Sequence, residues 1–332
     1  MGGKEVHMKI TVILCTYNRC QTLANALDSV ALTKFSDPVE WEVLVVDNNS
    51  NDQTRDVVED YCRRYPSRFR YLFEGQQGKS CALNAGIRAS DGDVIAFMDD
   101  DVTVDPMWLQ NLTAPLQNGD WAGVGGRTLP AQPYSLPRWL AMEGPYEMGG
   151  IVAAVFDLGD KPGKLDRPPF GTNMAFQKKM FDRYGLFRTD LGPRPGSEIR
   201  NEDTDFGRRL MSAGERLRYE PSAIVYHPVL EHRIQKGYLL AWWFDYGRAR
   251  VREWERGPDI WGISRRCFTF FKLIGTVLPV STLGWMAAWN PQRRFYRKCW
   301  VWVTTGQILE IYRQWRDAKG QANKSTPEID IG

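Results

Sequence analysis

Short runs of apolar, β-branched residues alternate with amphipathic segments over the first hundred positions of the chain. The short runs predict buried strands at 9–15, 41–46, 70–73 and 93–98. Helices are expected between them, one of them N-capped at Ser50 or Asn51. Strand–helix–strand repeats with short links predict a mostly parallel sheet with right-handed crossovers, flanked by helices.

Beyond residue 104 the pattern loosens. Helices are expected at 106–117, at 178–184 and from Glu202 onward, and strands at 121–127, 170–176 and 217–229. Residues 130–169 hold seven prolines and predict a long ordered loop. Loops of this length are uncommon unless they serve a function, and an acceptor-binding lid would be one.

Polar side chains follow the predicted strands where each one ends: Thr16 and Tyr17, Asp47 and Asn48, and Asp99 to Asp101. Ligands of parallel sheets bind at the carboxyl ends of the strands, so three separate segments point to one site. Alternate residues of a strand point the same way, so Asp99 and Asp101 are expected to face one point. A hard divalent cation, Mn²⁺ or Mg²⁺, would offset their repulsion, whereas the alternative is a solvated acidic turn.

Three further groups are candidates for chemistry. Lys79 follows a Gly-rich stretch, but Phe73 stands where a phosphate-binding P-loop needs glycine. Lys79 is therefore expected either to contact a diphosphate or a base as a plain cation or to lie on the surface at the start of a helix. Glu202 and Asp203 open a helix, which suits either a general base or simple capping. His227 follows a strand and would either complete a metal site with Asp101 or pack as an ordinary histidine.

The C-terminal third differs in composition. Residues 231–319 contain 16 Lys or Arg against 7 Asp or Glu, and nine of the 13 Trp follow Leu240. This combination is typical of membrane surfaces, although a basic helical subdomain packed on aromatic rings has it too. Leu273–Trp289 has no charge and is flanked by cations on both sides, which favours an in-plane hairpin kinked at Pro279 over a span or plain packing.

Overall composition is that of a globular protein, with 43% hydrophobic and 25% charged residues. The six scattered cysteines form no CxxC pair, so no disulfide framework is expected. The polar N-terminus predicts no signal peptide. We therefore expect a cytoplasmic protein that lies peripherally on the cytoplasmic face of the membrane through 240–318.

Six segments in order resemble glycosyltransferase family 2: ITVILCTYNR, VLVVDNNSNDQT, GKSCALNAGI, DVIAFMDDDV, GTNMAF and NEDTDFGRRL. The resemblance covers about residues 8–230. It implies a GT-A, Rossmann-like domain over 1–230, and the composition beyond it predicts a helical, basic and Trp-rich region over 231–320 and a tail over 321–332. It also implies an inverting, metal-dependent hexosyltransferase that uses a nucleotide sugar, as in polysaccharide biosynthesis.

The resemblance implies a role for each candidate residue. Asp203 would be the catalytic base, and the metal would be bound by Asp101, Asp99 and His227. The nucleotide and donor would contact Thr16, Tyr17, Arg19, Asp47, Asn48, Lys79, Asp99 and Asp100. The acceptor side would hold Gly171, Asn173 and Glu202. Many family members carry two acidic residues where this chain has Asp47 and Asn48, so the base contact, and with it the choice between UDP and GDP donors, stays open.

The expected acceptor is a glycan or a lipid-linked sugar of cell-envelope polysaccharide assembly. Two alternatives remain: a non-catalytic, membrane-docked carbohydrate-binding protein on the same fold, and a sugar-phosphate nucleotidyltransferase. The second would need a Gly-rich, cationic loop after the first strand, which CTYNRCQT lacks. Nucleic-acid binding would explain the basic residues but not the acidic cluster, so no nucleic-acid partner is expected.

Overall fold

The computed structural model describes residues 8–117, 119–148, 154–197, 199–254 and 265–324. The chain divides into two compact units, which we call the α/β unit and the helical unit. The α/β unit comprises Met1–Ser135, Gly149–Ser197 and Asn201–Leu230, and the helical unit comprises Leu136–Met148, Glu198–Arg200 and Glu231–Gly332.

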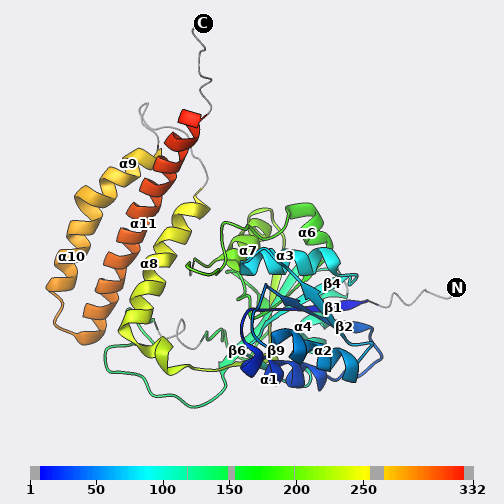
Figure 1. Cartoon of the computed structure of the whole chain (residues 1–332). Coiled ribbons are helices and arrows are strands. Elements are labelled where there is room, and N and C mark those ends of the chain that lie inside the picture. The colour runs from blue at the N-terminus through cyan, green and yellow to red at the C-terminus, as the bar shows by residue number, and fades with distance from the viewer. Residues whose placement is uncertain (1–7, 118, 149–153, 198, 255–264, 325–332) are drawn as a thin grey trace, which may run out of the picture. The chain divides into compact units, whose positions relative to one another are not determined.

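One mixed sheet forms the centre of the α/β unit (Figure 1). Its strands are β1 Ile10–Thr16, β2 Trp41–Asp47, β3 Phe69–Phe73, β4 Val94–Asp99, β5 Thr103–Val104, β6 Gly123–Pro130, β7 Gly163–Lys164, β8 Asn173–Gln177 and β9 Leu217–His227. They are ordered β3-β2-β1-β4-β8-β6-β9-β5, and β7 pairs with β9. The first four strands are parallel, whereas β8 runs antiparallel to both β4 and β6. The predicted α/β class with a mostly parallel sheet is confirmed.

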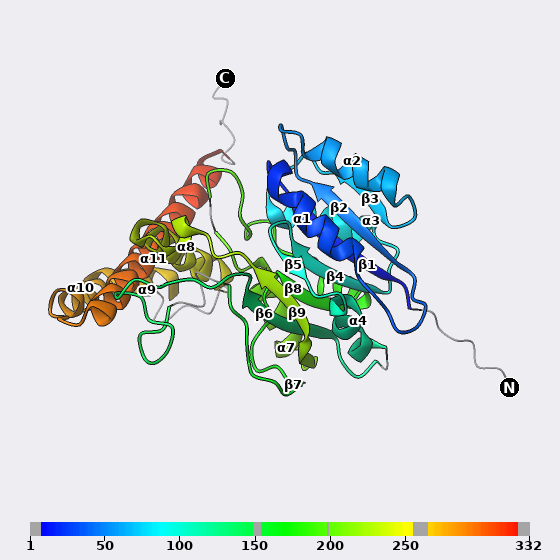
Figure 2. The same ribbon diagram turned by 90° about the horizontal axis from the view of Figure 1, so that it is seen from below.

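Helices cover both faces of this sheet (Figure 1), and Figure 2 shows one of the two faces from below. They are α1 Cys20–Ala31, α2 Thr54–Arg64, α3 Lys79–Ala89, α4 Trp108–Thr113, η1 Ala114–Leu116, α6 Lys179–Tyr184 and α7 Glu202–Ser212. Alternate residues of β1 face opposite sides, so Val12 packs in the cluster with α1, α2 and α4, while Ile13 packs with α3, α6 and α7. Burial on both faces explains why the strands are continuously apolar.

The predicted cap of α2 is wrong. The helix begins at Thr54, three residues after Asn51. The carboxylate of Asp52 accepts hydrogen bonds from the Thr54 N–H at 3.0 Å and from the Cys20 N–H at 3.1 Å. One aspartate therefore satisfies donors at the starts of both α1 and α2.

The helical unit is built from η2 Glu231–Ile234, α8 Lys236–Glu253, α9 Arg265–Lys272, the π-turn η3 Leu273–Val277, α10 Leu278–Met286 and α11 Pro291–Lys324. Residues 136–148 belong to this unit although they lie inside the range 1–230. Trp139 packs edge-on against Phe295 with ring centres 4.5 Å apart, and Tyr146 lies 5.7 Å from Tyr296.

Two glycines bring the backbones of α8 and α11 together. A Cβ on Gly247 would lie 2.1 Å from the Val303 carbonyl oxygen, and one on Gly306 would lie 2.1 Å from that of Phe244. Close to this crossing, Glu310 is 3% exposed. Its carboxylate accepts hydrogen bonds from Arg248 at 3.1 Å and Arg252 at 2.7 Å, so its buried charge is compensated.

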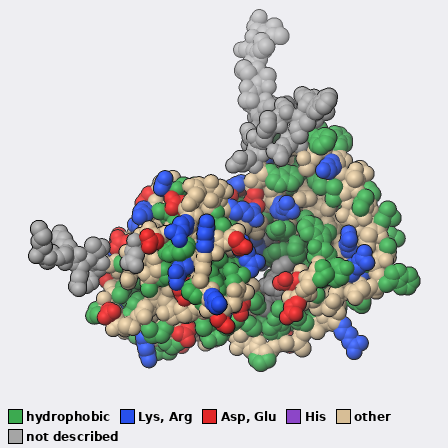
Figure 3. All heavy atoms as spheres, turned by 180° about the vertical axis from the view of Figure 1, so that it is seen from behind, with side chains coloured by type: hydrophobic (Ala, Val, Ile, Leu, Met, Phe, Trp, Pro, Cys, Tyr) green, Lys and Arg blue, Asp and Glu red, His purple; other side chains and the backbone are tan. Residues whose placement is uncertain are grey.

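The uncharged segment Leu273–Trp289 does not form a hairpin kinked at Pro279. Helical structure continues from Arg265 to Met286 through the π-turn, and the chain reverses only before α11. Arg266–Met286 is long and apolar enough to cross a membrane, and only 6% of it is buried within the protein. Apolar side chains are exposed on the helical unit (Figure 3), where Phe271 and Leu283 are each 66% exposed.

Candidate active site

The carboxyl ends of β1, β2 and β4 meet at one edge of the sheet. In the parallel register Thr16 stands beside Asp47, and Cys15 stands beside Asp99. Three strands that end together therefore deliver the polar residues predicted at that edge. The loops that follow are joined as well, because the Asn18 N–H donates to Ser50 and the Asn51 N–H donates to the Asn18 side chain.

Lys79, the first residue of α3, is a cation between carboxylates. Its Nζ lies 2.6 Å from Asp99 Oδ1 and 3.9 Å from Glu202 Oε1. Burial alone would lower the pKa of Lys79, but Asp99 and Glu202 hold that pKa above its usual value. Burial likewise acts to raise the pKa of Asp99, yet the Lys79 ammonium lowers it to about 2. The pair is ionised at neutral pH, with the ammonium at the site where a diphosphate is expected.

Asp100 and Asp101 share the Arg19 guanidinium. Arg19 Nη1 lies 2.8 Å from Asp101 Oδ2 and 3.3 Å from Asp100 Oδ1. Burial raises the pKa of Asp100 to about 6, against the opposing effect of Arg19. Asp99 pairs with Lys79, whereas Asp101 pairs with Arg19 and lies near His227.

Asp101 and His227 fit a divalent cation. His227 Nε2 lies 3.8 Å from Asp101 Oδ1, and Nδ1 lies 2.8 Å from the Pro228 carbonyl oxygen. A proton on Nδ1 directs the Nε2 lone pair of neutral His227 towards the carboxylate, as metal-binding histidines require. Within the described ranges, no group of three or more acidic, His or Cys side chains is arranged to hold a metal. Mg²⁺-type sites commonly use one or two protein ligands and take the rest from phosphate and water.

Asp203 lies in the first turn of α7 and is fixed by backbone groups. Its Oδ2 accepts a hydrogen bond from the Gly171 N–H at 2.6 Å, and its Oδ1 accepts one from the Thr204 N–H at 2.6 Å. A carboxylate held in this way at a helix N-terminus is positioned to accept a proton. The neighbouring Glu202 is 4% exposed and faces Lys79, so only Asp203 of the two is suited to meet an acceptor.

Some predicted site residues support the scaffold instead. Asn173 is 1% exposed, donates to the carbonyls of Arg127 and Ala223, and accepts from Trp108 Nε1. Because its side chain is buried and hydrogen-bonded to other protein groups, we do not expect Asn173 to contact the acceptor. Asp47 accepts hydrogen bonds from the Ser50 N–H at 2.9 Å and the Tyr71 hydroxyl at 2.9 Å.

The remaining predicted residues lie at the same edge. Tyr17 is 37% exposed, and Thr16 is buried at the end of β1. Sequence reasoning missed Tyr71, which orients Asp47, and Thr204, which orients Asp203. A Thr directly after the acidic residue was the only local signal for the second, and nothing local marked the first.

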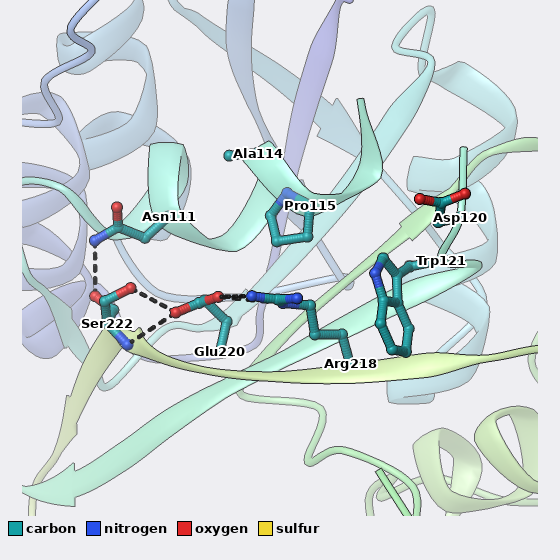
Figure 4. Close-up of a pocket in the computed structure, with 8 residues that line it drawn as sticks. All are labelled: Asn111, Ala114, Pro115, Asp120, Trp121, Arg218, Glu220 and Ser222. Carbon is teal, nitrogen blue, oxygen red and sulfur yellow. Dashed lines mark hydrogen bonds and ion pairs between the residues drawn. The ribbon is translucent and has the colours of Figure 1, made fainter. Parts of the chain in front are cut away.

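A cavity of about 430 Å³ lies elsewhere, between α4, η1 and the first half of β9 (Figure 4). Arg218 and Glu220 pair with each other there at 3.1 Å, and the Ser222 hydroxyl donates to Glu220 at 2.7 Å. His227 is at the other end of β9, so this cavity is separate from the acidic residues. We therefore do not take this cavity as the candidate active site.

Comparison with known proteins identifies relatives of this arrangement. The family model described as Glycosyl transferase family 2 matches residues 11–185, more than half of the chain. Glucosyl-dolichyl phosphate glucuronosyltransferase of Haloferax volcanii is 27% identical over 247 residues, 73% of this chain and 76% of that protein. Succinoglycan biosynthesis protein ExoM of Rhizobium meliloti is 28% identical over 253 residues, 76% of each chain.

A solved structure supports the fold. Mannosyltransferase PcManGT from Pyrobaculum calidifontis, in complex with GDP-Man and Mn²⁺, matches with a TM-score of 0.54 at 17% identity. The match covers 95% of this chain and 76% of that chain. At this identity the likeness concerns the fold, and it agrees with the predicted GT-A architecture.

Proposed function

The chain belongs to glycosyl transferase family 2, and we propose that it transfers a sugar from a UDP- or GDP-linked donor to an acceptor hydroxyl with inversion at the anomeric carbon. One observation carries the proposal: the Lys79–Asp99 pair and the Asp101–His227 pair meet where β4 ends, and Lys79 Nζ lies 3.9 Å from Glu202, the residue before Asp203. These groups suit, respectively, a leaving diphosphate, a divalent cation and an attacking hydroxyl.

The reaction is a single displacement. The acceptor oxygen bonds to the anomeric carbon as the bond from that carbon to the diphosphate oxygen breaks, and Asp203 takes the hydroxyl proton. Lys79 offsets the negative charge that the leaving nucleoside diphosphate gains. Attack from the face opposite the leaving group inverts the anomeric carbon.

We assign the cation site to Asp101 and His227. Mn²⁺ or Mg²⁺ bound there would act as a Lewis acid that stabilises the leaving diphosphate. The solved mannosyltransferase above contains Mn²⁺, which supports a divalent metal in this chain. Asp99 is better suited to hold Lys79 than to ligate the metal, because its Oδ1 lies 2.6 Å from Nζ.

The proposed acceptor is a lipid-linked glycan of polysaccharide assembly. The names of the two relatives, one acting on a glucosyl-dolichyl phosphate and one in succinoglycan biosynthesis, support this class. A lipid-linked acceptor requires the enzyme to work at a membrane surface, and we propose that the helical unit provides that contact.

The surface of α9 and α10 supports membrane docking. Its exposed apolar side chains are Phe268, Phe271, Ile274, Val280, Leu283 and Met286, with Trp289 97% exposed in the turn that follows. We call this set the apolar docking face. One exposed cation, Lys272, lies within this face between Phe271 and Ile274, and two more, Arg293 and Arg294, follow it at the start of α11. A cation inside the apolar run and two directly after it favour a helix that lies in the plane of an anionic leaflet over one that spans it.

A panel of donors tests the proposed reaction. Release of nucleoside diphosphate is measured from UDP-, GDP- and dTDP-sugars with Mn²⁺ or Mg²⁺, with a crude lipid extract as the acceptor. Metal-dependent release from one donor, lost in Asp101→Ala, supports a transferase and identifies the base. Binding without release from any donor would favour a carbohydrate-binding protein on the same fold.

A further inference from the structure

The side chain of Asn48 is fully engaged by one loop. Its Nδ2 donates to the carbonyl oxygens of Glu74 at 3.1 Å and Gln76 at 2.8 Å, and its Oδ1 accepts from the Gly78 N–H at 2.7 Å. The residue is 6% exposed. These three bonds use both amide hydrogens and the carbonyl oxygen of the side chain.

Only an amide satisfies this loop. A carboxylate at position 48 would place oxygen against the carbonyl oxygens of Glu74 and Gln76, which repel it, and only the Gly78 contact would survive. The loop would therefore lose two of its three hydrogen bonds to residue 48. Asn48 therefore holds residues 74–78 in one conformation.

The loop leads directly to the cation of the site. Gly78 has φ +136°, a conformation that side chains rarely adopt, and it immediately precedes Lys79. The backbone N–H of Lys79 donates to the Pro193 carbonyl at 2.8 Å, and its Nζ reaches Asp99. The position of the Lys79 ammonium thus depends on where residue 78 is held.

We propose that Asn48 is a positioning residue for the diphosphate subsite rather than a reader of the nucleobase. It acts by fixing the Glu74–Gly78 loop and, through it, Lys79. This inference rests on the proposed function, since it presupposes a nucleoside diphosphate donor. It also means that the exchange of an acid for an amide at position 48 does not by itself determine the choice of base.

Pyrophosphate separates the two roles because it carries no base. Binding of UDP, GDP and pyrophosphate, each with Mn²⁺, is measured by calorimetry for the wild type, Asn48→Asp, Asn48→Ala and Asn51→Asp. Asn51→Asp adds the same charge three residues away at an exposed position and serves as the matched control. Thermal melting confirms that each variant is folded.

A positioning role predicts that Asn48→Asp and Asn48→Ala weaken all three ligands by a similar factor, on the order of tenfold. Asn51→Asp should leave all three affinities close to those of the wild type. Unchanged pyrophosphate binding together with altered UDP or GDP binding, or a gain for UDP over GDP in Asn48→Asp, would overturn the proposal and make Asn48 a base contact.

Hydrogen exchange distinguishes failure of this inference from failure of the proposed function. If the wild type binds neither nucleotide, the proposed donor class is wrong, but the loop can still be examined. Faster amide exchange at residues 75–79 in both Asn48 variants, and not in Asn51→Asp, supports the role of Asn48 in fixing the Glu74–Gly78 loop. Unchanged exchange there would overturn it.

Discussion

The Gly171 N–H lies 2.6 Å from Asp203 Oδ2, so the proposed base is oriented by a backbone group from a distant loop. Asp203→Asn keeps the shape of the side chain but removes its ability to take a proton. We expect turnover to fall by about 10²–10⁴-fold, the usual contribution of a general base. Donor affinity should stay unchanged, which single-turnover kinetics and calorimetry would show together.

Asp182→Asn is the control for that experiment, because Asp182 is an exposed aspartate on α6. It should retain full turnover. Equal losses in the two variants, or an Asp203→Asn enzyme that turns over normally, would remove Asp203 from the role of base.

Arg19 competes with the proposed metal for the acidic turn. Its Nη1 lies 2.8 Å from Asp101 Oδ2, so the guanidinium already offsets the charge that a divalent cation would neutralise. Arg19→Gln should therefore bind Mn²⁺ several-fold more tightly in the absence of donor and melt at a lower temperature without metal. Electron paramagnetic resonance of free Mn²⁺ measures the first effect. Weaker Mn²⁺ binding would mean that Arg19 instead holds Asp101 in its ligating position.

Asp52 should give stability a defined dependence on pH. Burial acts to raise its pKa, but hydrogen bonds from Thr54 and Cys20 lower it to about 2. A folded-state pKa below the ordinary value stabilises the protein at pH values above that ordinary value, and the contribution is lost as the pH falls towards 2. Urea unfolding of the wild type and Asp52→Ala should differ by a constant amount from pH 7 to about pH 4 and by less below that. A difference that does not change with pH would contradict this origin.

The apolar runs around Val12 and Val45 were sufficient to predict the sheet, because burial on both faces requires continuous apolar strands. Polar residues directly after those strands then located the site edge. The nearness of His227 to Asp101 was one of the two predicted alternatives, but the pairing of Asp99 with Lys79 was not predictable in this way. Asp99 pairs with Lys79, 20 positions away, and Asp101 lies near His227 because β9 ends there.

Other contacts went unpredicted for the same reason. The hydrogen bonds from Asn48 to residues 74–78 and the packing of Trp139 on Phe295 depend on tertiary register, which local patterns do not encode. The hairpin expected at Pro279 failed because the π-turn at Leu273–Val277 takes up the irregularity next to the proline and the helix continues.

The crossing of α8 and α11 should tolerate no side chain at Gly247. A Cβ there would lie 2.1 Å from the Val303 carbonyl oxygen, so Gly247→Ala must separate the helices. We expect a loss of about 1–3 kcal/mol in the unfolding free energy, despite the better helix propensity of alanine. Gly237→Ala, in the same helix with no heavy atom within 4 Å, is the matched control and should be neutral or stabilising. Equal stability of the two variants in denaturant unfolding would show that the crossing is not tightly packed.

Charge placed on the apolar docking face should release the enzyme from membranes. Phe271 and Leu283 are each 66% exposed, so Phe271→Glu with Leu283→Glu should leave the fold intact, which circular dichroism would verify. Because burial of each such side chain contributes about 1.5–3 kcal/mol when complete, co-sedimentation with anionic vesicles should weaken at least tenfold.

Leu158→Glu, at a 39% exposed position of the α/β unit, should sediment like the wild type. Wild-type binding should also fall with salt, since exposed cations lie within the face and directly after it. If the wild type does not sediment with anionic vesicles at low salt, the docking face has another occupant and the lipid-linked acceptor loses its main structural support.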